Sequence, residues 1–311
     1  MLSRILPCAF GLLLSTSYGA TLNVQTQGGT TTLQINEHDP FHSTQSTVTQ
    51  ATLVEVSSTT LIIVYWKETP AGGSTTPYYA FAHDGHTFSR TRQANYLIKL
   101  LFAQFDPLVS IPSLPASLQA DANVHLHIVQ FFSQALKTLQ DGVTIVGGLV
   151  HGALPPHAVV VEMSDANKTT VAALPYVRWV GPYHPGYRLE SYLRDNWAQG
   201  TALFPTGTYN IVVFVAGTSQ KDAVAARVQS IGGTVDVNPS DGYTLIATLT
   251  YAQLGQVIRW DEVEFVDRWS EPSVGMDVGR ALGGAAILES VSGFTGAWMV
   301  KKASANASGR V

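Results

Sequence analysis

Apolar and polar segments follow one another in the same order along two stretches of the chain, residues 124–189 and 209–275. Each stretch holds an apolar opening segment, a glycine pair, a second apolar segment and an apolar closing segment. In the first stretch these are Ile128–Phe131, Gly147–Gly148, Val159–Val161 and Val177–Val180, and in the second Ile211–Phe214, Gly232–Gly233, Thr244–Ala247 and Val263–Val266. The copies are 83 residues apart at the opening segment, from 128 to 211, and 86 apart at the closing segment, from 177 to 263. This spacing indicates a duplication with small loop changes.

Helices are expected between the apolar segments of each copy. In the second copy, Ser219 can cap a helix whose apolar residues recur at helical spacing up to Ile231, and Gly232–Gly233 can end it. Thr250 and Gln253 have the spacing of a capping box at the start of another helix. Strand, helix, strand repeated twice is the split β-α-β plan. The expected fold class is therefore α/β (α+β), with two tandem ferredoxin-like βαββαβ modules preceded by a small β-rich subdomain.

The start of the chain has the pattern of a secretory signal peptide. Arg4 gives a positive beginning, Ile5–Leu14 is an apolar core too short to span a bilayer, and small residues precede a cleavage point after Gly19. A buried first helix is the alternative. The lone cysteine, Cys8, lies within this segment, so the mature chain would hold no thiol or disulfide. We expect a secreted or periplasmic protein with no membrane association after cleavage.

Local composition divides the rest of the chain. Thr, Ser and Gln are frequent after the signal, strand-like segments at 52–56 and 61–66 indicate a hairpin, and Asp84–Gly85 indicates a turn between strands at 78–82 and 87–89. Three prolines between 107 and 115 mark a linker. The predicted parts are a signal peptide (1–19), a Thr-rich leader and β-rich subdomain (20–106), a linker (107–123), the first module (124–189), a linker (190–208), the second module (209–275), and a linker and truncated tail (276–311).

Charge excludes one class of partner. The 311 residues include 18 basic and 22 acidic side chains, a formal net charge of -4, and charged residues make up only 13% of the chain. No cluster of Lys and Arg reaches the density that binding to nucleic acid requires, so nucleic acid is not an expected partner. An apolar content of 45% is ample for the cores of several domains.

Several segments in order resemble a known family. Arg178–Pro185, the strand at 128–131, the region Tyr78–Asp106 and the sequence Gly293–Gly296 resemble the N-terminal regions of large secreted subtilisin-like serine peptidases, the subtilase family. The resemblance implies that both modules are propeptide-like, and that they assist folding of a subtilisin-like protease domain and inhibit it. It further implies that the stretch after the last strand enters the protease cleft, with Asp267, Arg268, Trp269, Glu271 and Asp277 as candidate contact residues.

The chain departs from the family where catalysis would begin. No aspartate follows Asp277 and no histidine follows His184, so the catalytic Asp, His and Ser of a subtilase domain are missing. Asp84, His151 and Ser219 stand in the family's order but in the wrong local sequences. We interpret them as a hairpin turn, a strand end and a helix N-cap. No catalytic residues are predicted, and the chain by itself is not expected to be an enzyme.

No cofactor or metal is predicted either. His125 with His127, and His38 with His42, could each offer two metal ligands, but neither pair has an obvious third. Gly232–Gly233 ends a helix and therefore does not resemble a phosphate-binding loop. Trp179 and Trp269 are interpreted as packing residues.

Three functions from different classes are consistent with these patterns. The favoured one is a non-catalytic, propeptide-like module that binds a protease through one face of the second module's sheet and the segment after it. A truncated gene product, severed near Gly296, is the second. The third is a secreted binding or adhesion protein that uses the Thr-rich β region and has no link to proteolysis.

Overall fold

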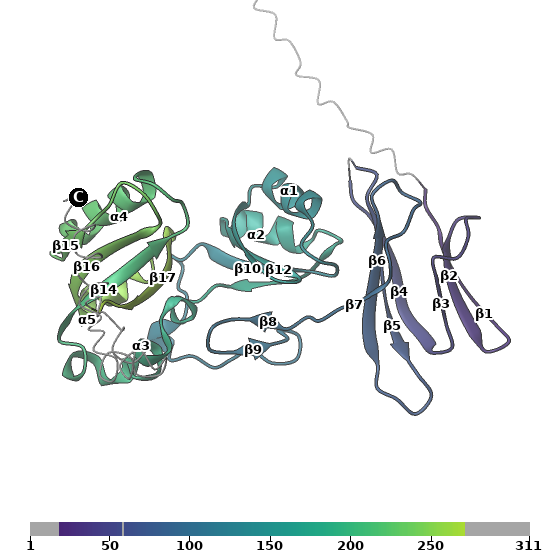
Figure 1. Ribbon diagram of the computed structural model, residues 1–311, viewed down its shortest axis with the longest axis horizontal. Helices are drawn as coiled ribbons and strands as arrows, with labels where there is room; N and C mark the ends of the chain where they lie inside the picture. Colours follow the sequence, from purple (N-terminus) through teal and green to yellow (C-terminus); the bar gives the residue numbers. More distant parts are fainter. Residues whose placement is uncertain (1–18, 58, 271–311) are drawn as a thin grey trace, which may run out of the picture. The chain divides into compact units, whose positions relative to one another are not determined.

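The computed structural model describes residues 19–57 and 59–270 of the chain (Figure 1). The predicted signal peptide, except Gly19, and the predicted tail 276–311 lie outside the described residues, as do Glu271 and Asp277. Within them the protein is of mixed α+β type, with mostly antiparallel sheets and few helices.

The N-terminal subdomain consists of two antiparallel sheets with strand orders β1-β2-β3 and β4-β5-β6-β7. Their bounds are β1 Leu22–Gln27, β2 Thr30–Ile35, β3 His42–Thr44, β4 Thr47–Glu55, β5 Ile62–Thr69, β6 Thr76–Ala82 and β7 Arg92–Gln93. The predicted hairpin of residues 52–56 and 61–66 is confirmed as part of the β4–β5 pair.

The prediction of the second hairpin was wrong about the strand that pairs with residues 78–82. β6 pairs with β7 at Arg92–Gln93, not with a strand at 87–89. The predicted turn is present: the Asp84 carboxylate accepts hydrogen bonds from the backbone N–H groups of His86 and Thr87, at 3.0 and 2.7 Å. After the turn the chain contacts β6 at Ser89, whose backbone N–H donates to the carbonyl of Phe81 at 2.8 Å, and the ladder with β7 follows at Arg92.

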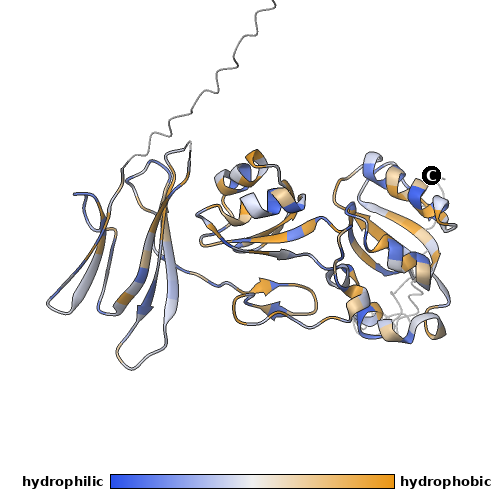
Figure 2. Ribbon diagram, turned by 180° about the vertical axis from the view of Figure 1, so that it is seen from behind, coloured by the Kyte–Doolittle hydropathy of each residue, from blue (hydrophilic) through white to orange (hydrophobic). Residues whose placement is uncertain are grey.

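Each of the two duplicated stretches forms a four-stranded antiparallel sheet with two helices on one face (Figure 1). The first contains β10 Leu126–Phe131, α1 Lys137–Ile145, β11 Leu149–Leu154, β12 Ala158–Glu162, α2 Asp165–Ala172 and β13 Val177–Pro182, with strand order β11-β12-β10-β13. The second contains β14 Thr206–Val213, α4 Ser219–Ser230, β15 Thr234–Val237, β16 Thr244–Thr250, α5 Tyr251–Val257 and β17 Val263–Arg268, with strand order β15-β16-β14-β17. In Figure 2 apolar residues are concentrated in the strands of both stretches.

The strand registers correct the alignment of the two copies by one residue. Val129 pairs with Val159 and Val180, and Ile211 pairs with Leu245 and Val266. Both opening strands also carry an irregularity one step later, between Gln130 and Phe131 and between Val212 and Val213. Val129 is therefore equivalent to Ile211, an offset of 82 residues and not the 83 expected from sequence. Because side chains alternate across a strand, one residue decides which face each of them occupies.

The glycine pairs play the same part in both copies. Gly147 and Gly232, just beyond α1 and α4, have φ values of +93° and +80°, the left-handed conformation that glycine adopts at low cost. The next residues, Gly148 and Gly233, donate backbone hydrogen bonds to Val143 and Val228, at 3.0 and 2.9 Å. A Cβ atom at either position would lie within 2.8 Å of valine or leucine side chains.

We expect Gly148→Ala and Gly233→Ala to lower the free energy of unfolding by similar amounts, about 1–3 kcal/mol each, because an added methyl group overpacks the same contact in both copies. Urea unfolding of the two variants provides the measurement. Gly152→Ala is the matched control, since no atom lies within 4 Å of its added Cβ, and it should change stability by less than about 0.5 kcal/mol. Clearly different losses at Gly148 and Gly233 would contradict the equivalence.

The helix starts confirm one predicted cap and correct another. Thr250 and Gln253 form the predicted capping box. The N-cap of α4 is Thr218, without a side-chain cap, rather than Ser219, which is the first residue of the helix. In the first copy, Ser164 caps α2 by accepting from the backbone of Asn167 at 3.2 Å.

Both predicted linkers contribute to packing. The first, residues 107–123, contains the 3-10 helix η1 Ala116–Leu118, and the side chain of Leu118 is fully buried. Just before it, at the end of the segment predicted as the β-rich subdomain, β8 Ile98–Lys99 and β9 Gln104–Phe105 form a separate pair. Between the two copies lie the 3-10 helix η2 Pro185–Arg188, α3 Ser191–Asp195 and the 3-10 helix η3 Trp197–Ala202. Leu193 and Trp197 are buried in the core of the second copy. The second copy therefore begins before residue 209, at Thr206 or earlier.

Candidate protein-binding surface

The sheet of the second copy has two different faces. Tyr209, Ile211 and Val213 of β14 are buried against residues of α4 and α5. The opposite side, which we call the outer face, is half-buried and consists of Thr208, Asn210, Val212, Thr244, Ile246, Thr248, Phe265 and Asp267. None of these eight side chains is fully buried, so the outer face can contact a partner.

Hydrogen bonds order one end of the outer face. The hydroxyl of Thr248 lies 2.9 Å from that of Thr208 on the neighbouring strand and donates to Asp236 of β15 at 2.8 Å. Side-chain hydrogen bonds thus connect the three strands β14, β16 and β15. Val212, Ile246 and Phe265 give the rest of the outer face an apolar character.

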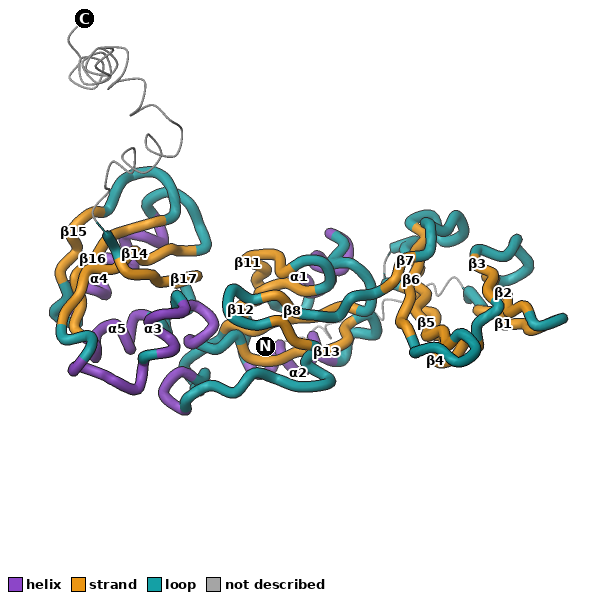
Figure 3. The backbone as a smooth tube through the Cα atoms, turned by 60° about the horizontal axis from the view of Figure 1, so that its bottom comes forward, coloured by secondary structure: helices purple, strands orange, loops and turns teal. Residues whose placement is uncertain are grey.

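The equivalent face of the first copy is closed by the chain itself. Residues 96–118, which we call the strap, run along this sheet (Figure 3). Ile98, Phe105 and Leu114 of the strap join one core cluster with the sheet residues Ile128 and Val160. Leu126, Ile128, Gln130, Ala158 and Val160 of this face are all at most 4% exposed. The first copy therefore has no free sheet face in this structure.

Arg178 fastens the strap to the sheet. Its guanidinium donates to both carboxylate oxygens of Asp106, at 2.8 and 2.9 Å, and to the side chain of Gln130. It also lies 4.1 Å from the centre of the Tyr96 ring, a cation–π distance. The Tyr96 hydroxyl donates to the carbonyl of Phe132 at 2.9 Å. Burial is the main reason that the pKa of Tyr96 is raised, so it donates as a neutral phenol.

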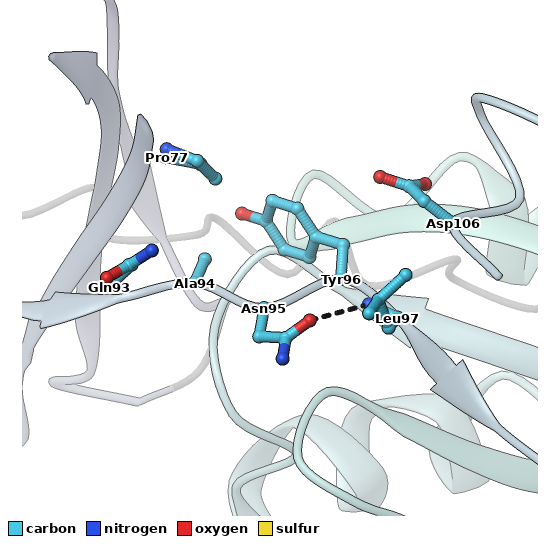
Figure 4. Close-up of a pocket in the computed structure, with 7 residues that line it drawn as sticks. All are labelled: Pro77, Gln93, Ala94, Asn95, Tyr96, Leu97 and Asp106. Carbon is cyan, nitrogen blue, oxygen red and sulfur yellow. Dashed lines mark hydrogen bonds between the residues drawn. The ribbon is translucent and has the colours of Figure 1, made fainter. Parts of the chain in front are cut away.

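An open cleft adjoins this contact. Figure 4 shows Tyr96 between Pro77 and Asp106, with Gln93, Ala94, Asn95 and Leu97 completing the lining. Asn95 accepts a hydrogen bond from the backbone of Leu97 at 3.1 Å, and the Asp106 carboxylate is already held by Arg178. Asn95 and Asp106 of the cleft thus help to position the strap.

Two of the predicted contact residues end the last strand of the second copy. Asp267 and Arg268 end β17, and Trp269 follows with 37% of its surface exposed. The Arg268 guanidinium is held within the protein, since it donates to Glu190 and stacks on Tyr192 at 3.9 Å. Glu271 and Asp277 lie outside the described residues. Of the three described residues, Arg268 and Trp269 are exposed and Asp267 is half-buried.

The other residues weighed as catalytic candidates lie in separate places and do not form a common site. His151 is inside β11, not at a strand end as predicted, and pairs with Glu162 at 2.9 Å. Asp84 closes its own turn, and Ser219 begins α4. Over residues 19–57 and 59–270 there is no group of three or more His, Cys, Asp or Glu side chains placed to hold a metal ion. Trp179 packs against the strap cluster.

Comparison with known proteins identified no relative: the chain matches no protein-family model, no curated protein and no solved structure. Among the helices of the described residues, none is long and apolar enough to cross a membrane.

Proposed function

We propose that this chain is the non-catalytic, propeptide-like region of a subtilisin-like serine peptidase, an exported module that assists folding of the catalytic domain and inhibits it. The proposal assigns both duplicated stretches to the ferredoxin-like βαββαβ class. Their strand orders, β11-β12-β10-β13 and β15-β16-β14-β17, support this assignment because each opening strand lies between the third and fourth strands of its copy.

One observation carries the proposal: of two equivalent sheets, one is closed by the strap and the other keeps an outer face that is only half-buried. A duplicated module with one closed and one open sheet suits a protein that binds a single partner through its second copy. Val212, Ile246 and Phe265 supply the apolar centre that protein interfaces require.

The position of the predicted contact segment also supports it. β17, whose outer residues are Phe265 and Asp267, leads directly into Trp269 and the stretch toward Asp277. A partner bound on the outer face would therefore contact β17, which carries the candidate contact residue Asp267.

Inhibition of subtilisin-like proteases tests the proposal. We expect the full chain to inhibit at least one such enzyme at micromolar concentration or below. Ile246→Arg should weaken this inhibition about 100-fold, because it places a charge in the centre of the outer face. Gln229→Arg adds the same charge to the exposed side of α4 and should leave inhibition unchanged. Failure to inhibit any protease of a broad panel, or equal losses in both variants, would overturn it.

A further inference from the structure

One residue of the closing strand is left unopposed in each copy by the register shift that both copies share. It is Arg178 in the first copy and Glu264 in the second. Val263 and Val266 are buried in the core of the second copy. Glu264 and Phe265 between them therefore both lie on the side of the outer face, because the extra residue interrupts the alternation of side chains. The two copies thus present opposite charges at equivalent positions.

In the first copy this side chain binds the segment that covers the sheet. The Arg178 guanidinium pairs with the Asp106 carboxylate of the strap at 2.8 Å and also donates to Gln130 of its own sheet. In the second copy Val212 stands at the place of Gln130 and offers Glu264 no polar group. A segment that covers the second sheet in the same way would therefore need a positive charge where the strap has a negative one.

The Glu264 carboxylate is half-buried and open to a partner. Over residues 19–57 and 59–270 it accepts no hydrogen bond, and neither of its oxygens is fully enclosed. Burial raises the pKa of Glu264, and His151, which acts in the opposite direction, already pairs with Glu162 at 2.9 Å. A cation brought by a partner would offset the cost of this partial burial.

Building on the proposed function, we propose that the partner protein places a basic side chain against the Glu264 carboxylate, in the reverse of the Arg178–Asp106 pair. A guanidinium suits this position, because it can pair with a carboxylate through two parallel hydrogen bonds and can stack on an aromatic ring. Phe265 and Val212, which lie opposite each other on the outer face, supply a ring and apolar contact beside it.

Small probes test this inference without a protease. The probe is phenylguanidinium, added to the full chain labelled with ¹⁵N, and phenylurea is its uncharged counterpart of similar shape. We expect phenylguanidinium to shift the amide signals of residues 211–213 and 263–266, with an affinity in the millimolar range. In Glu264→Gln this affinity should fall about tenfold. Asp236→Asn is the matched control and should leave it unchanged, because Asp236 is an exposed acid of the same sheet that already accepts from Thr248.

The outcomes separate this inference from the proposed function. Shifts in these two segments that require both Glu264 and the positive charge support the site for a basic side chain even if no protease is inhibited. Equal shifts with phenylurea, shifts that persist unchanged in Glu264→Gln, or no shift of these segments at millimolar probe overturn it, even if inhibition is found.

Discussion

Arg178→Ala is expected to lower the free energy of unfolding by about 3–5 kcal/mol, the range for breaking a buried ion pair by removing one partner. The side chains of Arg178 and Asp106 are 9% and 21% exposed. The substitution leaves the Asp106 carboxylate with only the backbone N–H of Leu108 as a donor, leaves the Gln130 oxygen without its donor, and removes the cation stacked on Tyr96. Urea unfolding would give the loss. Hydrogen exchange should also quicken at β8 and β9, since the strap loses its fastening.

Arg227→Ala is the matched control for this change. Arg227 also pairs with a carboxylate, Glu262, and lies over the ring of Trp260 at 4.2 Å. Its side chain is 44% exposed, however, so water screens the pair and the expected loss is below about 1 kcal/mol. Equal losses in the two variants would show that Arg178 does not hold the strap.

The second large effect is expected at Glu68 in the N-terminal subdomain. Its carboxylate, 9% exposed, lies at hydrogen-bond distance from three side chains: His42 at 2.7 Å, Trp66 at 2.8 Å and Thr44 at 2.9 Å. These contacts join β3 to β5, strands of two different sheets. Glu68→Ala leaves the buried Trp66 N–H and the half-buried side chains of His42 and Thr44 without their acceptor, and we expect a loss of about 3–5 kcal/mol in urea unfolding.

Two further variants make this prediction specific. Glu68→Gln keeps one acceptor oxygen and should cost less than Glu68→Ala. Glu37→Ala removes an exposed acid of the same subdomain and should change stability by less than about 0.5 kcal/mol. If Glu68→Ala were as mild as Glu37→Ala, the network would not stabilise the contact between the sheets.

The order of elements in both copies could be predicted from sequence because it rests on long apolar segments and glycine pairs. The register could not. Ile211, Val212 and Val213 are all apolar, so the sequence does not show which residues face the helices. Only the strand pairing reveals that Ile211 and Val213 do, while Val212 lies on the outer face.

The strap was missed for a different reason. Its prolines indicate a linker, and its fastening depends on Arg178 and Asp106, 72 residues apart in the chain. Nothing in the local pattern pairs two such distant residues. A sequence signal did exist in the apolar residues Leu114 and Leu118, since a solvent-exposed linker has little need of them. Ile98 and Phe105 belong to the part predicted as the β-rich subdomain, yet they pack with the first copy. The outer face likewise could not be told from the closed one before the strap was located.

Hydrogen exchange of the full chain, alone and with a subtilisin-like protease whose catalytic serine is replaced by alanine, tests the central claim most directly. We predict slower exchange in β14, β16 and β17 on binding and unchanged exchange in β10 and β12, whose sheet face the strap already covers. Slower exchange in the first copy alone, or no change in either copy at saturating protease, would contradict it.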